Sequence, residues 1–442
     1  MTDSPAVQAP LDPQESPILD RVLHLRDKLS LLKQDKSTYV KSHDVLRLYD
    51  EVIEQVHQLN VIREKHGKPL EQNRVDNVLD DCFQLISLFF LTIGRNNEAP
   101  AVYSMTSTIR RLLDHLKEAA FFSEKDLESA SHTLDKMQET VARGKETYSP
   151  HLLTLLGHRI DTCRNILAEL QDSLANMSPA LTPVHERLVS ILRSIAAANT
   201  RSKFPTAEVE GFREQLKEIK ATMVDGKFLA EDSTTPAGQD VVVGLLERCF
   251  LWSEIVLKRK GKIDERFKPT YEKLVDIRNQ LERLSLTQAW SLRETDLYNF
   301  QRQLDRVDES RVDGNFIDPT GYKADLHAQR TLLYLLRRSY AYIYGLLISS
   351  EPVSEALLPV YNQLQTLRRC LLEVKRSGGV SSPRELYPYS MKLNSIDNMR
   401  VDGKFLVGND IPEGQASVNA LLAECYDISY ELRTQAEEND SD

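Results

Sequence analysis

The stretch Val224-Asp225-Gly226-Lys227-Phe228 recurs at residues 312–316, where asparagine replaces the lysine, and unchanged at residues 401–405. The three glycines are 88 and 89 residues apart. Each copy follows a segment, such as residues 209–219, whose apolar side chains recur at helical spacing. A long fixed period combined with a helical pattern is typical of tandem helical units. The stretch therefore indicates that the chain contains repeated copies of one helical module.

A proline stands 43 to 45 residues before each of these three glycines. Proline is tolerated in the first turn of a helix because its missing N–H would have no partner there, so each proline predicts a helix start. Earlier in the chain, 44 residues separate Pro100 from Gly144, and a looser 50 residues separate Pro17 from Gly67. A third apolar helix is expected after each glycine. The sequence thus predicts five three-helix units, which begin near Pro17, Pro100, Pro183, Pro269 and Pro359.

The predicted fold is all-α, with five degenerate three-helix repeat units packed as a helical array or as linked bundles. Glycine and proline number 17 and 18, too few for a sandwich or barrel with many strands. The connections are short and poor in Gly and Ser, which favours close packing over flexible beads. Tails are expected at residues 1–15, acidic and rich in proline, and at residues 436–442, acidic. The units are expected at residues 16–97, 98–178, 179–262, 263–350 and 351–435.

The glycine of each unit is expected to end the second helix in the left-handed C′ position, where glycine carries no steric penalty. The phenylalanine two residues later is expected to pack back on that helix end. A shared binding loop is the alternative interpretation. The predicted repeat caps are Gly67, Gly144, Gly226, Gly314 and Gly403.

The formal net charge is −10, from 56 basic and 66 acidic residues. A field of that sign repels phosphates unless a local patch reverses it, which disfavours general nucleic-acid binding. One basic run, residues 258–262, follows a predicted helix, where cations favour the negative helix end. The alternatives for this run are a nuclear-import signal, a docking point for an acidic partner, or contact with an anionic surface or nucleic acid.

The sequence carries no recognisable reaction centre. The phosphate-binding loop, the dinucleotide fingerprint, the nucleophile elbow and the HExxH zinc motif are all missing. Cys82, Cys249 and Cys425 occupy the same place in three units, and helix packing would hold such positions about 8–10 Å apart, too far to share a zinc ion. We expect buried small residues there, in a reducing compartment. The prediction is no catalytic residue, no cofactor and no metal.

The third helix of the fourth unit combines tyrosines with arginines. Aromatic residues and arginine are enriched at binding hot spots, which favours partner contact. Core packing is the alternative interpretation of the same residues. The candidate partner-binding residues are Arg337, Arg338, Tyr340, Tyr342 and Tyr344.

The repeated VDGKF stretch, the Pro-x-(Tyr/His) helix starts and the acidic end resemble a fungal family that carries only a domain-of-unknown-function label, number 2408. The resemblance covers nearly the whole chain, although the first two units read HGKPL and RGKET at the equivalent place. It implies a cytoplasmic and nuclear protein. It implies no activity, cofactor or catalytic residue.

These features favour a non-enzymatic helical-repeat scaffold or adaptor that binds other proteins. One alternative is a helical enzyme with an active site between units. Another is an anionic-surface or nucleic-acid binder that uses the basic run. The longest uncharged apolar run, Leu85 to Ile93, is far shorter than the roughly 18 to 20 residues of a bilayer span, so no membrane span is expected.

Overall fold

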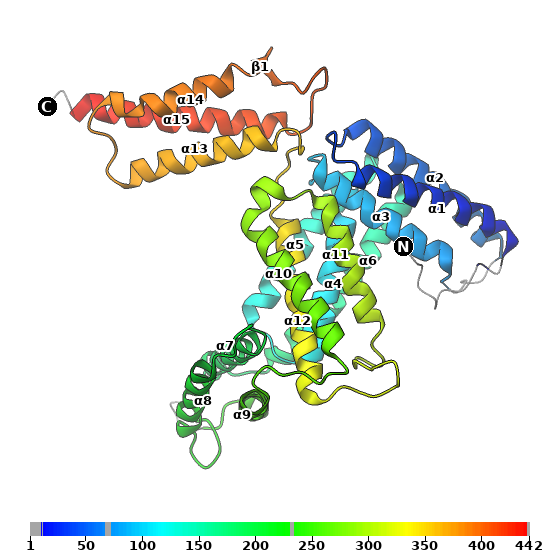
Figure 1. The fold of residues 1–442 in the computed structure, drawn as a ribbon, viewed down its shortest axis with the longest axis vertical. Helices are drawn as coiled ribbons and strands as arrows, with labels where there is room; N and C mark the ends of the chain where they lie inside the picture. Colours follow the sequence, from blue (N-terminus) through cyan, green and yellow to red (C-terminus); the bar gives the residue numbers. More distant parts are fainter. Residues whose placement is uncertain (1–9, 11, 67–71, 230–233, 440–442) are drawn as a thin grey trace.

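The computed structural model describes residues 10, 12–66, 72–229 and 234–439. Within these ranges the chain forms fifteen α-helices, and its one sheet is a hairpin of two-residue strands. The predicted all-α class is confirmed. Figure 1 shows a central body from which one helical bundle projects at the C-terminal end and a second at the opposite end.

The helices follow one another in five triplets. Whether the triplets are copies of one unit stays a prediction. The first two triplets are α1 (Ser16–Gln34), α2 (Ser42–His66) and α3 (Arg74–Thr92), then α4 (Val102–Ala119), α5 (Glu124–Arg143) and α6 (Pro150–Ala175). The last three are α7 (Thr182–Asn199), α8 (Thr206–Ala221) and α9 (Gln239–Arg259), then α10 (Lys268–Ser291), α11 (Leu297–Glu309) and α12 (Leu326–Ile348), then α13 (Leu358–Arg376), α14 (Tyr387–Asp397) and α15 (Gln415–Asn439). The strands are β1 (Arg400–Val401) and β2 (Lys404–Phe405), and 3₁₀ turns lie at Pro13–Glu15, Ala99–Ala101, Gly144–Glu146, Glu294–Asp296 and Pro383–Leu386.

Proline lies at the start of every triplet, as predicted. Pro17, Pro183 and Pro359 occupy the first turn of their helices. Pro269 is the second residue of α10, and Pro100 lies in the 3₁₀ turn that leads into α4. No backbone hydrogen bond is lost at these positions because first-turn N–H groups have no partner inside a helix.

The fifteen helices bury three separate hydrophobic cores. The largest joins α1–α6 with α10–α12, while α7–α9 and α13–α15 each enclose a core of their own. Helix α12 lies against α4 as well as α10, and α3 lies against α11. The fourth triplet therefore packs on the first two, and the third projects to the side. The fold combines a shared body with two attached bundles, so neither a regular array nor a row of separate bundles describes it.

Gly226, Gly314 and Gly403 lie in hairpin turns and do not cap helices, so their predicted role is wrong. Each glycine and the aspartate before it adopt left-handed backbone angles, with φ of +49° and +77° at residues 225 and 226. Val224 and Lys227 exchange backbone hydrogen bonds of 2.8 and 3.0 Å across them. This is a two-residue hairpin turn of the type that an Asp-Gly pair favours. Because α8 ends at Ala221, the glycine lies beyond the helix and does not cap it.

The two remaining predicted caps differ from these three. Gly144 is the C-cap residue of α5, but its backbone is right-handed, with φ of −77°. A side chain there would lie 3.0 Å from the Ala99 side chain, so close packing explains the glycine better than left-handed geometry. Gly67 lies outside the described residues.

The phenylalanine after each hairpin turn is buried, as expected, and a glutamine on the next helix holds its backbone. Gln415 donates to the carbonyl oxygen of Phe405 at 2.8 Å and accepts from its N–H at 2.9 Å. Gln329 makes the same pair of bonds with Phe316. The side chain satisfies backbone groups that the short hairpin leaves free, so the turn is attached to the following helix.

The predicted tails are too long at both ends. Residues Pro13–Glu15 form a 3₁₀ turn, and the Glu15 carboxylate is buried 2.8 Å from the Arg63 guanidinium. At the other end α15 continues to Asn439, with Ala436 buried. The ion pair and the apolar contact order residues whose composition alone suggests a solvated tail. Residues 1–9, 11 and 440–442 lie outside the described part.

The C-terminal bundle is joined to the body at a tight crossing of backbones. Gly94, with φ of +85°, lies so close to the segment before α13 that an added Cβ would stand 2.6 Å from the Ser354 nitrogen. Arg95 pairs with Glu413 at 2.6 Å, and Arg293 pairs with Glu355 at 2.6 Å. The bundle is therefore fixed to the body by direct contacts in addition to its covalent link. None of the helices in the described ranges has the length and apolarity needed to cross a membrane.

Candidate functional site

A stripe of side chains along α12 faces the bundle formed by α7–α9 at one end and α5 at the other, where Tyr344 contacts Thr133. Arg330, Tyr334, Arg337, Ala341 and Tyr344 are alternately four and three residues apart, the spacing that places side chains on one helix face. The opposite face of α12 is apolar and fills the main core. Because α12 is fixed on that side, the stripe is held at the junction between the body and the α7–α9 bundle.

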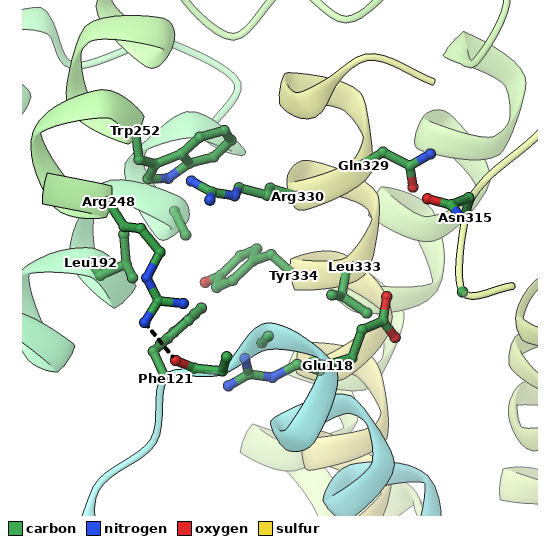
Figure 2. Close-up of a pocket in the computed structure, with 15 residues that line it drawn as sticks. Glu118, Phe121, Leu192, Arg248, Trp252, Asn315, Gln329, Arg330, Leu333 and Tyr334 are labelled. Carbon is green, nitrogen blue, oxygen red and sulfur yellow. Dashed lines mark hydrogen bonds between the residues drawn. The ribbon is translucent and has the colours of Figure 1, made fainter. Parts of the chain in front are cut away.

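A cavity of about 250 Å³ opens at this junction, and we call it the arginine pocket (Figure 2). It lies between α7, α9, α12 and the loop that follows α4. In Figure 2 the side chains of α9 and α12 converge on it from two sides. Its main polar and aromatic lining is Phe121, Arg248, Trp252, Arg330, Tyr334 and Arg337.

None of the guanidinium groups of the pocket forms an ion pair with a carboxylate in the part of the chain that the structure describes. Arg248 donates to the backbone oxygen of Ala120 at 3.0 Å, the bond drawn in Figure 2. The guanidinium carbon of Arg330 lies 5.6 Å from the Trp252 ring centre, and that of Arg337 lies 4.9 Å from the ring centre of Phe121. Within the described residues neither Arg330 nor Arg337 makes a hydrogen bond or ion pair through its side chain.

Burial makes these unpaired charges costly. Burial lowers the pKa of Arg330, and the positive charge of Arg248 lowers it further. Burial and then the charge of Arg193 lower the pKa of Arg337 to about 10. Glu118 is the single carboxylate among the described lining residues, and it already pairs with Arg311. The carboxylates of Asp126 and Glu118 act on the pKa of Arg337 in the opposite direction, but neither forms an ion pair with it. Partly desolvated cations that outnumber the nearby carboxylates are a favourable environment for an anion from solution.

A second cavity, of about 580 Å³, adjoins the pocket and shares Phe121, Tyr334 and Arg337 with it; we call it the α12 groove. Its walls come from α4, α5, α7 and α12. The half-buried side chains of Leu112 and Leu116 supply part of its apolar surface. Its charged lining is Lys125, Asp126, Arg193, Arg337 and Arg338.

The lining of the two cavities is positively charged, whereas the net charge of the whole chain is negative. Among the described residues, six cationic side chains line them, against the two carboxylates of Glu118 and Asp126. Asp126 pairs with Arg193 and accepts the backbone N–H of Ser123 at the start of α5. Across the whole chain, by contrast, acidic residues outnumber basic ones by 66 to 56. The local patch that an acidic chain needs in order to attract anions is present here.

Three of the five predicted contact residues line the groove, and two contact other parts of the body. Arg337, Arg338 and Tyr344 line the groove. The ring centre of Tyr342 lies 4.4 Å from the guanidinium carbon of Arg338. The Tyr342 hydroxyl donates to the Glu282 carboxylate at 2.9 Å. Tyr340 is only 1% exposed and donates to Asp305 at 2.7 Å inside the body, so it is unavailable to a partner. Tyr340 is therefore core packing, the alternative that its helix position also allowed.

Sequence reasoning missed the half of the site that other helices supply. Phe121, Arg193, Arg248 and Trp252 come from a loop, α7 and α9, far from α12 in the chain. No spacing rule connects them with residues 330–344, because a helical period describes one helix only. The basic run at residues 258–262 lies elsewhere, with Arg259 paired to Asp325 and its lysines exposed.

A polar cluster inside the body differs from the arginine pocket because its arginines form ion pairs with neighbouring aspartates. Two adjoining cavities of about 590 and 300 Å³ are lined by charged residues of α3, α4, α6 and α11. Asp81 lies 3.1 Å from Arg302, and Asp80 lies 3.5 Å from Arg159. Burial raises the pKa of Asp305 to about 6 even though arginines surround it. Among the described residues, six arginines and five carboxylates line these two cavities, so the charges are nearly balanced. Ion pairs between them link the first, second and fourth triplets.

Four of the five cysteines are buried, as predicted for Cys82, Cys249 and Cys425, and Cys370 is exposed. The buried thiols approach backbone oxygens of the first helix of their triplet, as Cys249 does with Leu188 at 3.7 Å. Within the described ranges, no cluster of three or more His, Cys, Asp or Glu side chains is arranged to hold a metal ion.

We expect one cysteine, Cys370, to react rapidly with a thiol reagent in the native protein. Burial raises the pKa of Cys249 to about 12 and those of Cys163 and Cys425 to about 11, which leaves little reactive thiolate at neutral pH. Labelling followed by peptide mass spectrometry measures this, with all five thiols reacting in denaturant as the control. Rapid labelling of Cys249 in the folded protein would contradict the burial described here.

Comparisons with known proteins place the chain among fungal proteins. A family model described as "Protein of unknown function (DUF2408)" matches residues 174–294 and 351–442. A CUB1 family protein of Schizosaccharomyces pombe is 40% identical over 449 residues, which covers 100% of this chain and 97% of that protein. The "Cu(2+) suppressing and bleomycin sensitive protein 1" of Saccharomyces cerevisiae is 38% identical over 504 residues, 96% of this chain and 91% of that protein. No solved structure matches the chain. The predicted resemblance to an uncharacterised fungal family is confirmed.

Proposed function

The chain belongs to the CUB1 family, and from that premise we propose that it is a non-enzymatic helical scaffold that binds an acidic segment of a partner protein in the α12 groove. The names of the relatives include no enzymatic activity. The observation that carries the proposal is the reversal of charge at the groove and the arginine pocket, six cations against two carboxylates on an acidic chain.

The composition of the groove favours a peptide over a small molecule. Its half-buried leucines and aromatic rings offer apolar contact, and Lys125 and Arg338 are exposed cations at its edge. Arginine and aromatic side chains around an apolar centre are the residue types that dominate protein interfaces. Charges at the edge of such a surface accelerate association with a partner of opposite sign. An acidic segment with apolar anchors is the occupant that fits both features.

The enzyme alternative has one specific observation in its favour, the polar cluster inside the body. Asp305, with its pKa raised to about 6 beside a cavity, is the kind of group that general acid–base catalysis uses. Asp305 is already engaged, however, by Arg111 and Arg302 and by the Tyr340 hydroxyl, which donates to it. Structural ion-pair networks shift pKa values in the same way. We therefore place the scaffold proposal first.

The proposal is tested by photo-crosslinking from within the groove. A photoreactive residue at Ala341, in the full-length chain in fungal cells, is expected to attach to a protein whose captured peptide is acidic. The same residue at Lys392, exposed on α14, provides the control position. Capture of the same proteins from both positions, or of none from Ala341, would contradict binding in the groove.

A further inference from the structure

We propose that the arginine pocket binds a phosphate monoester carried by the partner segment that occupies the α12 groove. This inference rests on the proposed function for the source of the phosphate. The pocket adjoins the groove and shares Phe121, Tyr334 and Arg337 with it, so a segment in the groove can place one side chain in the pocket. The site thus adds recognition of a modified residue to recognition of an acidic segment.

The charges of the pocket fit a dianion. Arg248 and Arg330 are close enough for the charge of one to lower the pKa of the other, and Arg337 adds a third guanidinium. Arg330 and Arg337 rest on aromatic rings and bond no carboxylate among the described residues, so their N–H groups are free to donate. Guanidinium forks match the oxygens of a phosphate better than any other side chain does. A monoester of charge about −1.5 to −2 at neutral pH would neutralise much of the excess.

The pocket is expected to bind a phosphorylated side chain in preference to a carboxylate. Trp252 is 2% exposed, and its ring centre lies 5.7 Å from that of His327 and 5.6 Å from the Arg330 guanidinium carbon. A carboxylate of the partner segment would meet the same cations with a smaller charge and fewer acceptor oxygens. We therefore expect a phosphorylated side chain to bind more tightly than an unmodified acidic one.

Tryptophan fluorescence measures the binding directly. The chain has two tryptophans, so Trp290→Phe leaves Trp252 as the single reporter beside Arg330. The probes are N-acetyl-O-phosphoserine amide, inorganic phosphate and N-acetylserine amide. Saturable changes are expected with the two phosphates, weaker in added salt, and none with the unmodified serine amide. No saturable change with either phosphate overturns the site, and binding of inorganic phosphate alone overturns a partner-borne monoester.

Arg330→Met separates a binding role from a structural one. We expect at least about ten-fold weaker binding of the phosphoserine probe, with Arg376→Met, an exposed arginine on α13, unchanged. Without ligand, the thermal midpoint of Arg330→Met should equal or exceed that of the parent, because an unpaired buried charge is removed. A structural arginine would lower it. Arg248→Gln, at the edge of the pocket, should also weaken binding, and two variants that bind as the parent does overturn the proposal.

The crosslinking experiment distinguishes this inference from the proposed function. Suppose that the photoreactive residue at position 341 captures an unphosphorylated acidic segment, with the same yield in Arg330→Met as in the parent. The phosphate site is then wrong and the scaffold proposal stands. If phosphoserine binds but Ala341 captures no protein, the scaffold proposal fails, and with it the partner-borne source. Capture of a phosphorylated segment that depends on Arg330 supports both.

Discussion

Asp308→Asn is expected to lower the free energy of unfolding by about 3–5 kcal/mol at pH 7, the effect of removing one partner from a buried ion cluster. The Asp308 side chain is 7% exposed and accepts from Arg311 at 2.7 Å and from His115 at 3.1 Å. Arg111 lies 3.1 Å from its second oxygen. The amide would leave two guanidinium groups without their shared counter-charge at the contact between α4 and α11. Urea unfolding followed by circular dichroism measures the loss.

The effect should depend on pH in a defined direction. Burial alone would raise the pKa of Asp308, but hydrogen bonding to His115 and the charges of His115 and Arg111 lower it to about 2, against 3.8 in an unfolded chain. A lowered pKa means that the stabilising contribution is present above about pH 4 and is lost as the pH falls towards 2. The difference between Asp308→Asn and the parent should therefore narrow below pH 4. A difference that stays constant or widens there contradicts this origin.

Asp114→Asn is the matched control for Asp308. Asp114 lies on α4 and pairs with Arg110 at 3.8 Å, with both side chains substantially exposed. Solvent-exposed pairs contribute about 0–1 kcal/mol, so the control should change stability little. A loss at Asp114 as large as at Asp308 would mean that burial is not the cause.

Gly94→Ala is expected to separate the C-terminal bundle from the body. The added Cβ would lie 2.6 Å from the Ser354 nitrogen and 2.7 Å from the Val353 carbonyl carbon, backbone atoms that cannot rotate away. Overpacking costs about 1–3 kcal/mol, and a left-handed alanine adds about 1–2 kcal/mol. Because α13–α15 has its own core, the bundle should remain helical while the join opens. Limited proteolysis at residues 349–357 is expected to accelerate.

Gly408→Ala controls for backbone strain. Gly408 also has a positive φ, of +63°, but no heavy atom of the described residues lies within 4 Å of its added Cβ. It should therefore show the cost of the left-handed conformation without the collision. Equal proteolysis of Gly94→Ala and the parent at the join would show that the two backbones do not cross as closely as described.

Local features of the fold could be predicted from the sequence because their causes are local. The prolines start helices, and the apolar third helix expected after Gly314 is present as α12, Leu326–Ile348. The prediction that the Asp-Gly glycines cap helices is wrong, because these pairs form hairpin turns beyond the helix ends. The pair is a hairpin signal, and the two left-handed residues needed for that turn are Asp225 and Gly226.

The arrangement of the triplets could not be predicted in the same way. The fourth triplet packs on the first two through contacts such as Arg302 with Asp81. These residues lie more than two hundred positions apart in the chain, and sequence periodicity carries no information about such pairs. The candidate site shares this origin. Arg337 and Arg338 could be singled out on α12, but Arg248 and Trp252 meet them only because the α7–α9 bundle folds against that helix.

The central claim is that the cationic α12 groove holds the partner, and charge reversal tests it most directly. The measured quantity is the yield of protein crosslinked from Ala341 in the parent, in Arg338→Glu at the edge of the groove, and in Arg376→Glu on the exposed face of α13. We predict a loss of at least about ten-fold in Arg338→Glu and no change in Arg376→Glu. An unchanged yield in Arg338→Glu would contradict the claim.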